Sequence, residues 1–438
     1  MKLIYIVIDG MGDVPIEELD NKTPLEAAET PYMDSLAKTG KTGLMYTVGK
    51  GIAPESDVAV VSILGYNPFK YHVSRGSLES VGAGLKMSNG DLALRCNFAT
   101  LADDGNSIID RRAGRDLTQE EADELAQAVN EQVQLESYPC SLQIKSTATY
   151  RAALVIQSEE KQFSSNISNT DPAYKRVNGV GVADLEAEMI LKTCEPLDKS
   201  EEAKISAELV NEFTRKAMPV LDKHEVNKKR LEEGKLKANV LLSRDAGSMV
   251  PTFPFLSELY GLSFVCLADM NVERGISRLA GMSLVDLPIP SESLENDCKL
   301  RLKKLFEVLP HYDCFYIHIK GPDVPGHDGD FDLKSRLIAI VDEFFVGGML
   351  QRINLEDHLV CITADHATPC ELKAHSDDPV PLLIAGNKLQ GDRVQRFSEK
   401  ECKMGELGIL SKGTELMPRL VEYFKMSEDG LVSSVSYE

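Results

Sequence analysis

The chain has 438 residues, of which 43% are hydrophobic and 27% charged, and its 69 acidic and 48 basic residues give a formal net charge of −21. This composition is typical of a globular protein with about two or three domains, and the acidic balance argues against a general role in binding nucleic acid or anionic membranes. The nine cysteines are scattered and include no CxxC pair. They predict reduced thiols and a protein of the cytoplasm.

The first predicted element is the apolar run from Leu3 to Ile8, which shows no polar alternation. Such a run is typical of a strand buried on both faces of a parallel sheet, and Asp9 ends it far short of a membrane span. Similar runs recur at residues 239–244, 263–268, 314–320, 358–365 and 381–386, and helical patterns lie at residues 294–308, 333–350 and 415–424. This alternation predicts an α/β fold with a mostly parallel, doubly wound sheet flanked by helices.

The middle of the chain has a different pattern. It contains predicted helices at residues 118–133 and 200–220 and a predicted strand at residues 150–157, which is followed by a polar loop. We therefore expect a smaller α+β domain, residues 91–237, inserted into a discontinuous core domain that comprises residues 1–90 and 238–438.

Polar residues stand directly after three of the predicted buried strands, at the sheet edge where open parallel sheets build their sites. These residues, with one histidine further along the chain, are Asp9, Asp323, His327, Asp365, His366 and His375. Taken singly, an Asp after a strand is often a helix N-cap, and a histidine is often a surface residue or a hydrogen-bonded core residue. Asp and His together, without Cys, are ligands that suit Mn, Mg or Zn, so the joint pattern predicts a metal site.

Ser56 lies at the predicted start of a helix in the segment GIAPESDVAVVSILGYNP. A serine in this position is commonly an N-cap. The functional alternative is a nucleophile, whose hydroxyl needs a base or a metal ion to lower its pKa. No His–Asp relay is evident near Ser56 in the sequence, so a metal-activated serine and a simple cap both stay open at this point.

Ten motifs spread over nearly the whole chain carry a family resemblance. They are VIDGMGD, KTPLEAAETPYMDSLA, PESDVA, LGYNP, RGSLES, NFATL, DRRAGR, GHDGD, TADHATPC and HSDDPVPLLIAG. Together they resemble the archaeal-type cofactor-independent phosphoglycerate mutases, members of the alkaline phosphatase superfamily. The resemblance implies an alkaline-phosphatase-like core and an isomerase of glycolysis and gluconeogenesis, which interconverts 3-phosphoglycerate and 2-phosphoglycerate through a phosphoserine and needs no bisphosphoglycerate.

The resemblance also implies a set of metal ligands and a nucleophile, Ser56. One divalent ion would be held by Asp9, Ser56, Asp365 and His366, and a second by Asp323, His327 and His375. Mn or Mg are the expected ions, with Zn or Co as alternatives. The negative charges of three carboxylates and a serine alkoxide roughly balance the positive charges of two divalent cations. The site would therefore have no large excess of negative charge to repel a phosphoryl dianion.

The substrate of this family is a phosphorylated carboxylate, and guanidinium groups match both of its anionic ends. A single exposed arginine usually belongs to a solvated surface ion pair. The resemblance, however, implies substrate contacts for Asp110, Arg112, Arg115, Arg244 and Arg274. The chain departs from the family pattern at Glu55, Asp245 and Arg274, where relatives usually have Gly, Gly and Lys, and none of these departures removes a metal ligand or the serine.

Two other functions stay open. A metal-dependent phosphatase or a small-molecule phosphotransferase, such as a homoserine-kinase-like relative, would use the same fold and ligands. A non-catalytic binding protein would be expected to have lost a ligand or the serine. The expected partner is a small molecule, phosphoglycerate, with no nucleic acid and no membrane, and the sequence does not indicate the oligomeric state. We expect the insert to cover the metal cleft, with Arg112 and Arg115 facing it.

Overall fold

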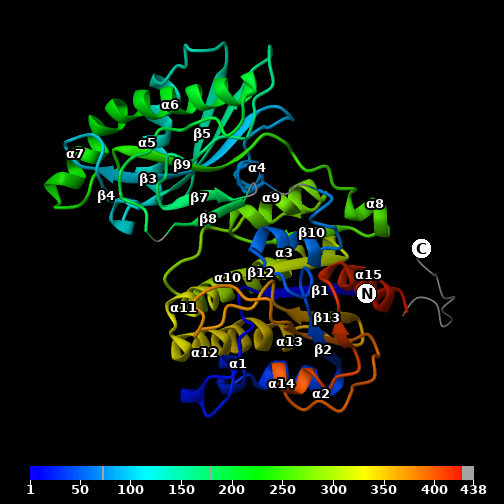
Figure 1. Ribbon diagram of the computed structural model, residues 1–438. Coiled ribbons are helices and arrows are strands. Elements are labelled where there is room, and N and C mark those ends of the chain that lie inside the picture. The colour runs from blue at the N-terminus through cyan, green and yellow to red at the C-terminus, as the bar shows by residue number, and fades with distance from the viewer. Residues whose placement is uncertain (72–73, 178–179, 185, 427–438) are drawn as a thin grey trace. The chain divides into compact units, whose positions relative to one another are not determined.

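The computed structural model describes residues 1–71, 74–177, 180–184 and 186–426. The chain folds as two compact units (Figure 1). The core unit comprises Met1–Tyr71 and Thr252–Glu438, and the insert unit comprises His72–Pro251. The chain therefore leaves the core unit once and returns to it once.

An eight-stranded sheet forms the centre of the core unit. In spatial order its strands are β11 (Ser283–Leu284), β10 (Phe264–Leu267), β12 (Cys314–Ile319), β1 (Lys2–Ile8), β13 (His358–Thr363), β14 (Val380–Gly386), β2 (Lys41–Met45) and β15 (Gly408–Leu410). Among the described strands of this sheet, only β14 runs antiparallel to its neighbours. The predicted α/β class and mostly parallel sheet are therefore confirmed.

Helices cover this sheet (Figure 1). They are α1 (Pro24–Ala27), α2 (Pro31–Thr39), α3 (Ser56–Ile63), α8 (Leu256–Tyr260), α9 (Asn271–Leu279), α10 (Leu294–Val308), α11 (Asp323–Asp328), α12 (Phe331–Ile340), α13 (Gly348–Leu350), α14 (Glu399–Cys402) and α15 (Leu416–Lys425). Every residue of β1 from Leu3 to Ile8 is buried, which explains why its sequence shows no polar alternation. The predicted helix at 333–350 corresponds to α12, a π-helical turn at Val341–Gly347 and α13.

A second sheet, of five strands, organises the insert unit. Its strands are β4 (Ile108–Asp110), β3 (Leu92–Leu101), β6 (Arg151–Gln157) and β5 (Ser141–Ala148) in that order, with β9 (Val240–Gly247) also paired to β3, and a separate hairpin is formed by β7 (Tyr174–Val177) and β8 (Val180–Ala183). The helices are α4 (Arg75–Gly82), α5 (Gln119–Gln132), α6 (Glu201–Asp222) and α7 (Glu225–Glu232). The predicted helices at 118–133 and 200–220 are α5 and α6, capped by the side chains of Thr118 and Ser200.

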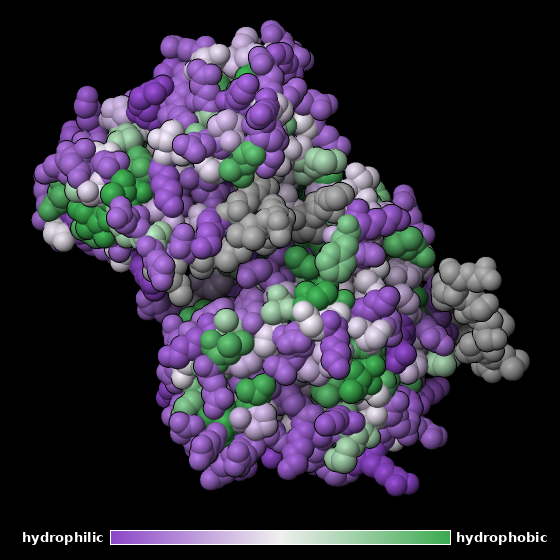
Figure 2. Space-filling view, viewed as in Figure 1, coloured by the Kyte–Doolittle hydropathy of each residue, from purple (hydrophilic) through white to green (hydrophobic). Residues whose placement is uncertain are grey.

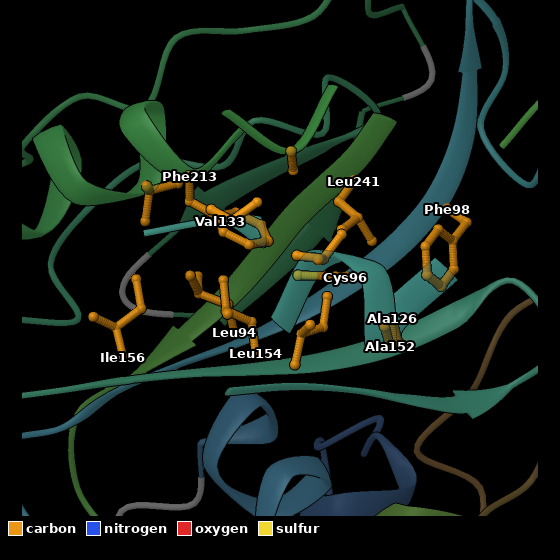
Figure 3. Packing of buried hydrophobic residues seen from close by; sticks show 14 of the residues in the cluster. Leu94, Cys96, Phe98, Ala126, Val133, Ala152, Leu154, Ile156, Phe213 and Leu241 are labelled. Carbon is orange, nitrogen blue, oxygen red and sulfur yellow. The ribbon is translucent and has the colours of Figure 1, made fainter. Parts of the chain in front are cut away.

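The core of the insert unit lies between this sheet and the helices. Leu94 and Leu154 of the sheet gather with Val133 and Phe213 of the helical layer (Figure 3). All four side chains are almost completely buried. Burial of side chains of this size stabilises a fold by about 1.5–3 kcal/mol each, so the insert unit has a hydrophobic core of its own.

The boundaries of the insert differ from the prediction, which placed residues 72–90 and 238–251 in the core domain. The structure places both segments in the insert unit. The predicted strand at 239–244 is β9, and it pairs antiparallel with β3, with Leu241 opposite Phe98. An apolar run indicates a buried strand but not the sheet in which the strand finds its partner.

Hydrophilic side chains cover most of the face shown in Figure 2, and the hydrophobic patches between them are small. Across residues 1–71, 74–177, 180–184 and 186–426, no helix combines the length and the apolar character that a membrane crossing requires.

Candidate metal centre

Three neighbouring strands bring the predicted ligands to one edge of the core sheet. In the register of β1 with its two neighbours, Ile8 lies opposite Ile319 and Val7 opposite Thr363. The residues that follow these strand ends therefore lie close together. Gly10, directly after Asp9, has a left-handed φ of 61°, and a Cβ there would lie 2.8 Å from Asp323, so this turn requires glycine.

The first ligand group consists of Asp323, His327 and His375. Asp323 and His327 are four residues apart at the two ends of one turn of α11, which places their side chains on the same face. The Oδ1 atom of Asp323 lies 3.5 Å from Nε2 of His327 and 3.5 Å from Nε2 of His375, and the two Nε2 atoms are 3.1 Å apart. The three side chains thus converge on one point, and their role as ligands stays a prediction.

The second group surrounds His366. Its Nε2 atom lies 3.1 Å from Oγ of Ser56, 3.5 Å from Oδ1 of Asp9 and 3.4 Å from Oδ2 of Asp365. Ser56 is the first residue of α3, and the N-cap residue is Glu55. The simple cap is therefore not the role of Ser56. Sequence reasoning saw no histidine near this serine because 310 residues separate Ser56 from His366.

Backbone carbonyls orient two of the histidines. The Nδ1–H of His375 donates to the carbonyl oxygen of Pro54 at 2.8 Å, and the Nδ1–H of His327 donates to that of Lys373 at 3.1 Å. Because each Nδ1 atom faces a carbonyl oxygen, Nε2 is the ring nitrogen that each histidine directs toward Asp323. This arrangement is typical of histidines that bind metal ions.

Thr368 orients the third histidine and links the two groups. Its hydroxyl donates to Oδ1 of Asp323 at 2.8 Å, and its oxygen lies 3.1 Å from Nδ1 of His366. The single hydroxyl proton goes to the carboxylate, so the Nδ1–H of His366 is the donor in the second bond. The Nε2 lone pair of His366 is therefore directed toward Ser56 and Asp9. Thr368 is buried, and sequence reasoning did not single it out.

The donor set fits divalent metal ions. Within the described part of the chain, the buried oxygens Asp9 Oδ1 and Asp365 Oδ2 have no hydrogen-bond partner. Burial and the neighbouring charge of Asp9 raise the pKa of Asp365 well above its ordinary value. For His375, burial lowers the pKa, but Asp323 and Glu55 outweigh it and raise the pKa to about 9. A bound cation would satisfy the orphan oxygens and stabilise the carboxylates in their charged form.

Among the described residues there are three sets of ligand-type side chains whose ligand atoms, within each set, lie within 4.8 Å of one another. The atoms belong to Asp323, His327 and His375, to Asp9, Asp323 and His366, and to Asp9, His318 and Asp365. Carboxylate oxygens and imidazole nitrogens in this number suit Mn, Mg or Zn, and two of the sets share Asp9.

Sequence reasoning missed three further residues next to these groups: Glu273, His318 and Lys320. The Nζ atom of Lys320 lies 3.0 Å from Oδ2 of Asp9 and 2.7 Å from Oε1 of Glu273. His318 Nε2 lies 3.7 Å from Oδ2 of Asp365, and burial together with the charge of Lys320 lowers the pKa of His318 well below its ordinary value. Lys320 ends the motif CFYIHIK, and its place directly after a buried strand was the available signal.

The predicted substrate residues lie in both units. Asp110 orders its own loop, because its Oδ1 accepts hydrogen bonds from the backbone amides of Arg112 and Gly114. Arg112 is half-buried and Arg115 is exposed. Burial raises the pKa of Tyr150, but the charges of Arg151, Arg112 and Arg115 outweigh it and lower the pKa, so these arginines form a basic patch around this tyrosine.

Arg244 lies on β9 beside the buried carboxylate of Asp171. Its Nη1 donates to Asp171 at 2.8 Å, while Arg111 binds the same carboxylate through Nε at 2.8 Å. The Arg244 guanidinium also lies 4.4 Å from the ring centroid of Tyr174. Among the described residues, Nε of Arg244 makes no hydrogen bond, but it lies within ion-pair distance of Asp245, at 3.5 Å from Oδ2.

Two departures from the family pattern have visible consequences. Asp245 has a left-handed φ of 56°, and its Oδ2 accepts a hydrogen bond from Nη1 of Arg95 at 2.9 Å and lies 3.5 Å from Nε of Arg244. Arg274 belongs to the core unit, on α9, where its Nη1 donates to the carbonyl oxygens of Ala268 and Val285. Substrate contacts of Arg112, Arg115, Arg244 and Arg274 stay predictions.

Comparisons with known proteins agree in one family. A family model described as 2,3-bisphosphoglycerate-independent phosphoglycerate mutase matches residues 37–227. The chain is 43% identical to the 2,3-bisphosphoglycerate-independent phosphoglycerate mutase of Aeropyrum pernix over 96% of this chain and 98% of the relative.

Two solved structures are similar in both sequence and fold. One, a protein from Pyrococcus horikoshii, has a TM-score of 0.75 and 32% identity, with 98% of each chain covered. The other, a cofactor-independent phosphoglycerate mutase from Thermoplasma acidophilum, has a TM-score of 0.62 and 30% identity, with 97% of this chain and 100% of the other covered.

Proposed function

The chain belongs to the family of 2,3-bisphosphoglycerate-independent phosphoglycerate mutases, and we propose that it interconverts 3-phosphoglycerate and 2-phosphoglycerate through a phosphoserine at Ser56. The comparisons support this isomerase of glycolysis and gluconeogenesis rather than the phosphatase or phosphotransferase alternative. The substrate is a small molecule, and the reaction needs no bisphosphoglycerate. Location in the cytoplasm stays a prediction.

The observation that carries the proposal is the position of Ser56. Its hydroxyl is held 3.1 Å from Nε2 of His366, at the N-terminus of α3, beside both ligand groups. The positive end of a helix favours negative charge, so this position suits both a serine alkoxide and a phosphoserine.

The proposed ligands are those that the family resemblance implies. They are Asp9, Ser56, Asp365 and His366 for one divalent ion, and Asp323, His327 and His375 for the other, with Mn or Mg expected and Zn or Co as alternatives. When bound, the two ions would lower the pKa of the Ser56 hydroxyl and neutralise charge on the phosphoryl group. The orphan oxygens of Asp9 and Asp365 support this assignment.

Ser56 attacks the phosphoryl group in line in the proposed mechanism. The bond from phosphorus to Ser56 Oγ forms as the bond from phosphorus to the 3-oxygen of the substrate breaks, and the proton lost by the Ser56 hydroxyl is balanced by the one that this 3-oxygen takes up. The glycerate reorients while it stays bound. Its 2-hydroxyl then loses a proton and attacks the phosphoserine, which returns Ser56 to its starting state.

Water has to be kept away while the phosphoserine exists, because transfer to water would make the enzyme a phosphatase. We assign this role to the insert unit, and we assign to Asp110, Arg112, Arg115, Arg244 and Arg274 the binding of the substrate's anionic groups. The guanidinium of Arg244 supports this assignment, because guanidinium donors match carboxylate and phosphate geometry and its Nε makes no hydrogen bond among the described residues.

The test is a mutase assay coupled to enolase, with chelated protein reloaded separately with Mn, Mg, Zn or Co and with bisphosphoglycerate omitted. We expect chelation to abolish activity, reloading to restore it, and added bisphosphoglycerate to have no effect. Ser56→Ala should be inactive. Ser62→Ala is the matched control, because Ser62 is buried on the same helix and its Oγ has no partner among the described residues. Release of inorganic phosphate without 2-phosphoglycerate would contradict the proposal.

A further inference from the structure

Lys320 and Glu273 form an ion pair next to Asp9. Lys320 follows β12, and its ammonium lies 2.7 Å from Oε1 of Glu273 and 3.0 Å from Oδ2 of Asp9. Glu273 is 1% exposed and Asp9 5% exposed, while the Lys320 side chain retains 21% of its exposure. Taking charges out of water is costly, so a general stabilising role does not by itself explain such a cluster.

Lys320 gives the two carboxylate oxygens of Asp9 different surroundings. The Oδ2 atom is held by the ammonium of Lys320, whereas Oδ1, which has no hydrogen-bond partner in the described part of the chain, lies 3.5 Å from Nε2 of His366. A carboxylate that no neighbouring side chain binds can rotate or offer both oxygens to a cation. Here only one oxygen is presented toward His366.

Glu273 holds Lys320 in this place. A lysine side chain is a flexible stem with a point charge at its end, and its position depends on its partners. Glu273 supplies one partner from α9, a helix that also anchors itself through Arg274 to the carbonyl oxygen of Val285. The Oε2 atom of Glu273 has no hydrogen-bond partner among the described residues, whereas its Oε1 lies 2.7 Å from Nζ of Lys320 and 3.8 Å from Nε2 of His318, so the contact with Lys320 is the closer of these two.

We propose that Glu273 and Lys320 are positioning residues of the metal centre, in which Glu273 holds Lys320 and Lys320 holds Oδ2 of Asp9 so that Oδ1 alone faces the cation. This inference rests on the proposed function only for the role of Asp9 as a ligand. Glu273 and Lys320 carry opposite charges. Removing Lys320 makes the local net charge more negative, removing Glu273 makes it more positive, and removing both leaves the local net charge as it is in the wild type.

The test compares Lys320→Met, Glu273→Gln and the double variant. The affinity for Mn²⁺ is measured by titrating metal-free protein and following free Mn²⁺ by electron paramagnetic resonance, and kcat and KM are measured separately. Lys320→Met should bind Mn²⁺ about tenfold more tightly, since a neighbouring positive charge is lost, and Glu273→Gln about tenfold more weakly.

The double variant separates charge from position. Its Mn²⁺ affinity should lie within about threefold of the wild type, yet its kcat should stay at least about tenfold lower, because nothing holds Oδ2 of Asp9. Lys299→Met is the control, since Lys299 pairs with Glu295 on the exposed side of α10 and should change neither quantity.

The inference is overturned if both single variants shift Mn²⁺ affinity in the same direction or leave it unchanged, or if the double variant turns over at the wild-type rate. Should Lys320→Met fail to fold, the double variant, which restores the local net charge although Asp9 loses its lysine, and Lys320→Arg, which keeps the charge, are used instead. Lys320→Arg should keep the wild-type affinity with reduced kcat, and a wild-type kcat would count against positioning. The affinity is measured without substrate, so opposite shifts in a protein that lacks mutase activity would contradict the proposed function and still support the location of Glu273 and Lys320 beside the cation.

Discussion

Thr368→Val removes a hydroxyl that connects the two ligand groups. The side chain is completely buried, donates to Oδ1 of Asp323 at 2.8 Å and accepts from Nδ1 of His366 at 3.1 Å. Valine has nearly the same shape but no hydrogen-bonding atom. The substitution therefore leaves the packing in place and deletes both hydrogen bonds.

The expected cost follows from these two contacts. A hydrogen bond to a charged carboxylate contributes about 1.5–3 kcal/mol, and a buried N–H left without an acceptor costs about 1–3 kcal/mol. We therefore expect metal-free Thr368→Val to lose about 2.5–6 kcal/mol of unfolding free energy in the core unit. His366 is also free to carry its proton on Nε2, which points toward Ser56, so Mn²⁺ affinity and kcat should each fall about 10–100-fold.

The matched control is Thr363→Val. Thr363 is equally buried, lies on β13 and donates to the carbonyl oxygen of Pro381 at 2.9 Å, so its loss removes one hydrogen bond that does not touch a candidate ligand. We expect about 1–2 kcal/mol of destabilisation in urea unfolding and unchanged Mn²⁺ affinity. If Thr368→Val bound Mn²⁺ and turned over like Thr363→Val, the link between the two ligand groups would have no functional role.

Three further predictions concern His375, Arg115 and Glu212. His375→Ala should bind one equivalent of metal fewer than the wild type, as measured by elemental analysis, and undiminished metal would remove His375 from the ligand set. Arg115→Ala should lower mutase flux more than hydrolysis of a small aryl phosphate, because only the natural substrate carries a carboxylate, and equal losses would refute that role. Burial raises the pKa of Glu212, but Lys216 and two backbone amides outweigh it and lower the pKa from its ordinary 4.5 to about 2. The stability that Glu212 contributes is therefore present above pH 4.5 and is lost as the pH falls through about 2, so acid unfolding should be less steep in Glu212→Gln, and an unchanged profile would contradict the assignment.

Local sequence patterns determined the strands that carry the candidate ligands. The run at residues 314–320 has no polar alternation because both faces of β12 are buried, and the polar residues after it mark the point where the strand leaves the sheet. The start of α3 at Ser56 and the capped starts of α5 and α6 were likewise readable, since capping depends on residues within one turn.

Residues distant in sequence meet only through the tertiary structure, and no local pattern encodes such a meeting. The apolar run of β9 was recognisable as a strand, but its place in the insert sheet depends on pairing with β3. The contact of Ser56 with His366 arises because α3 and the end of β13 reach the same sheet edge. For the same reason, the sequence did not show that Glu273 and Lys320 form an ion pair. From sequence alone a charged residue is expected to be exposed to solvent. Only the tertiary structure shows that Lys320 lies between the buried carboxylates of Asp9 and Glu273.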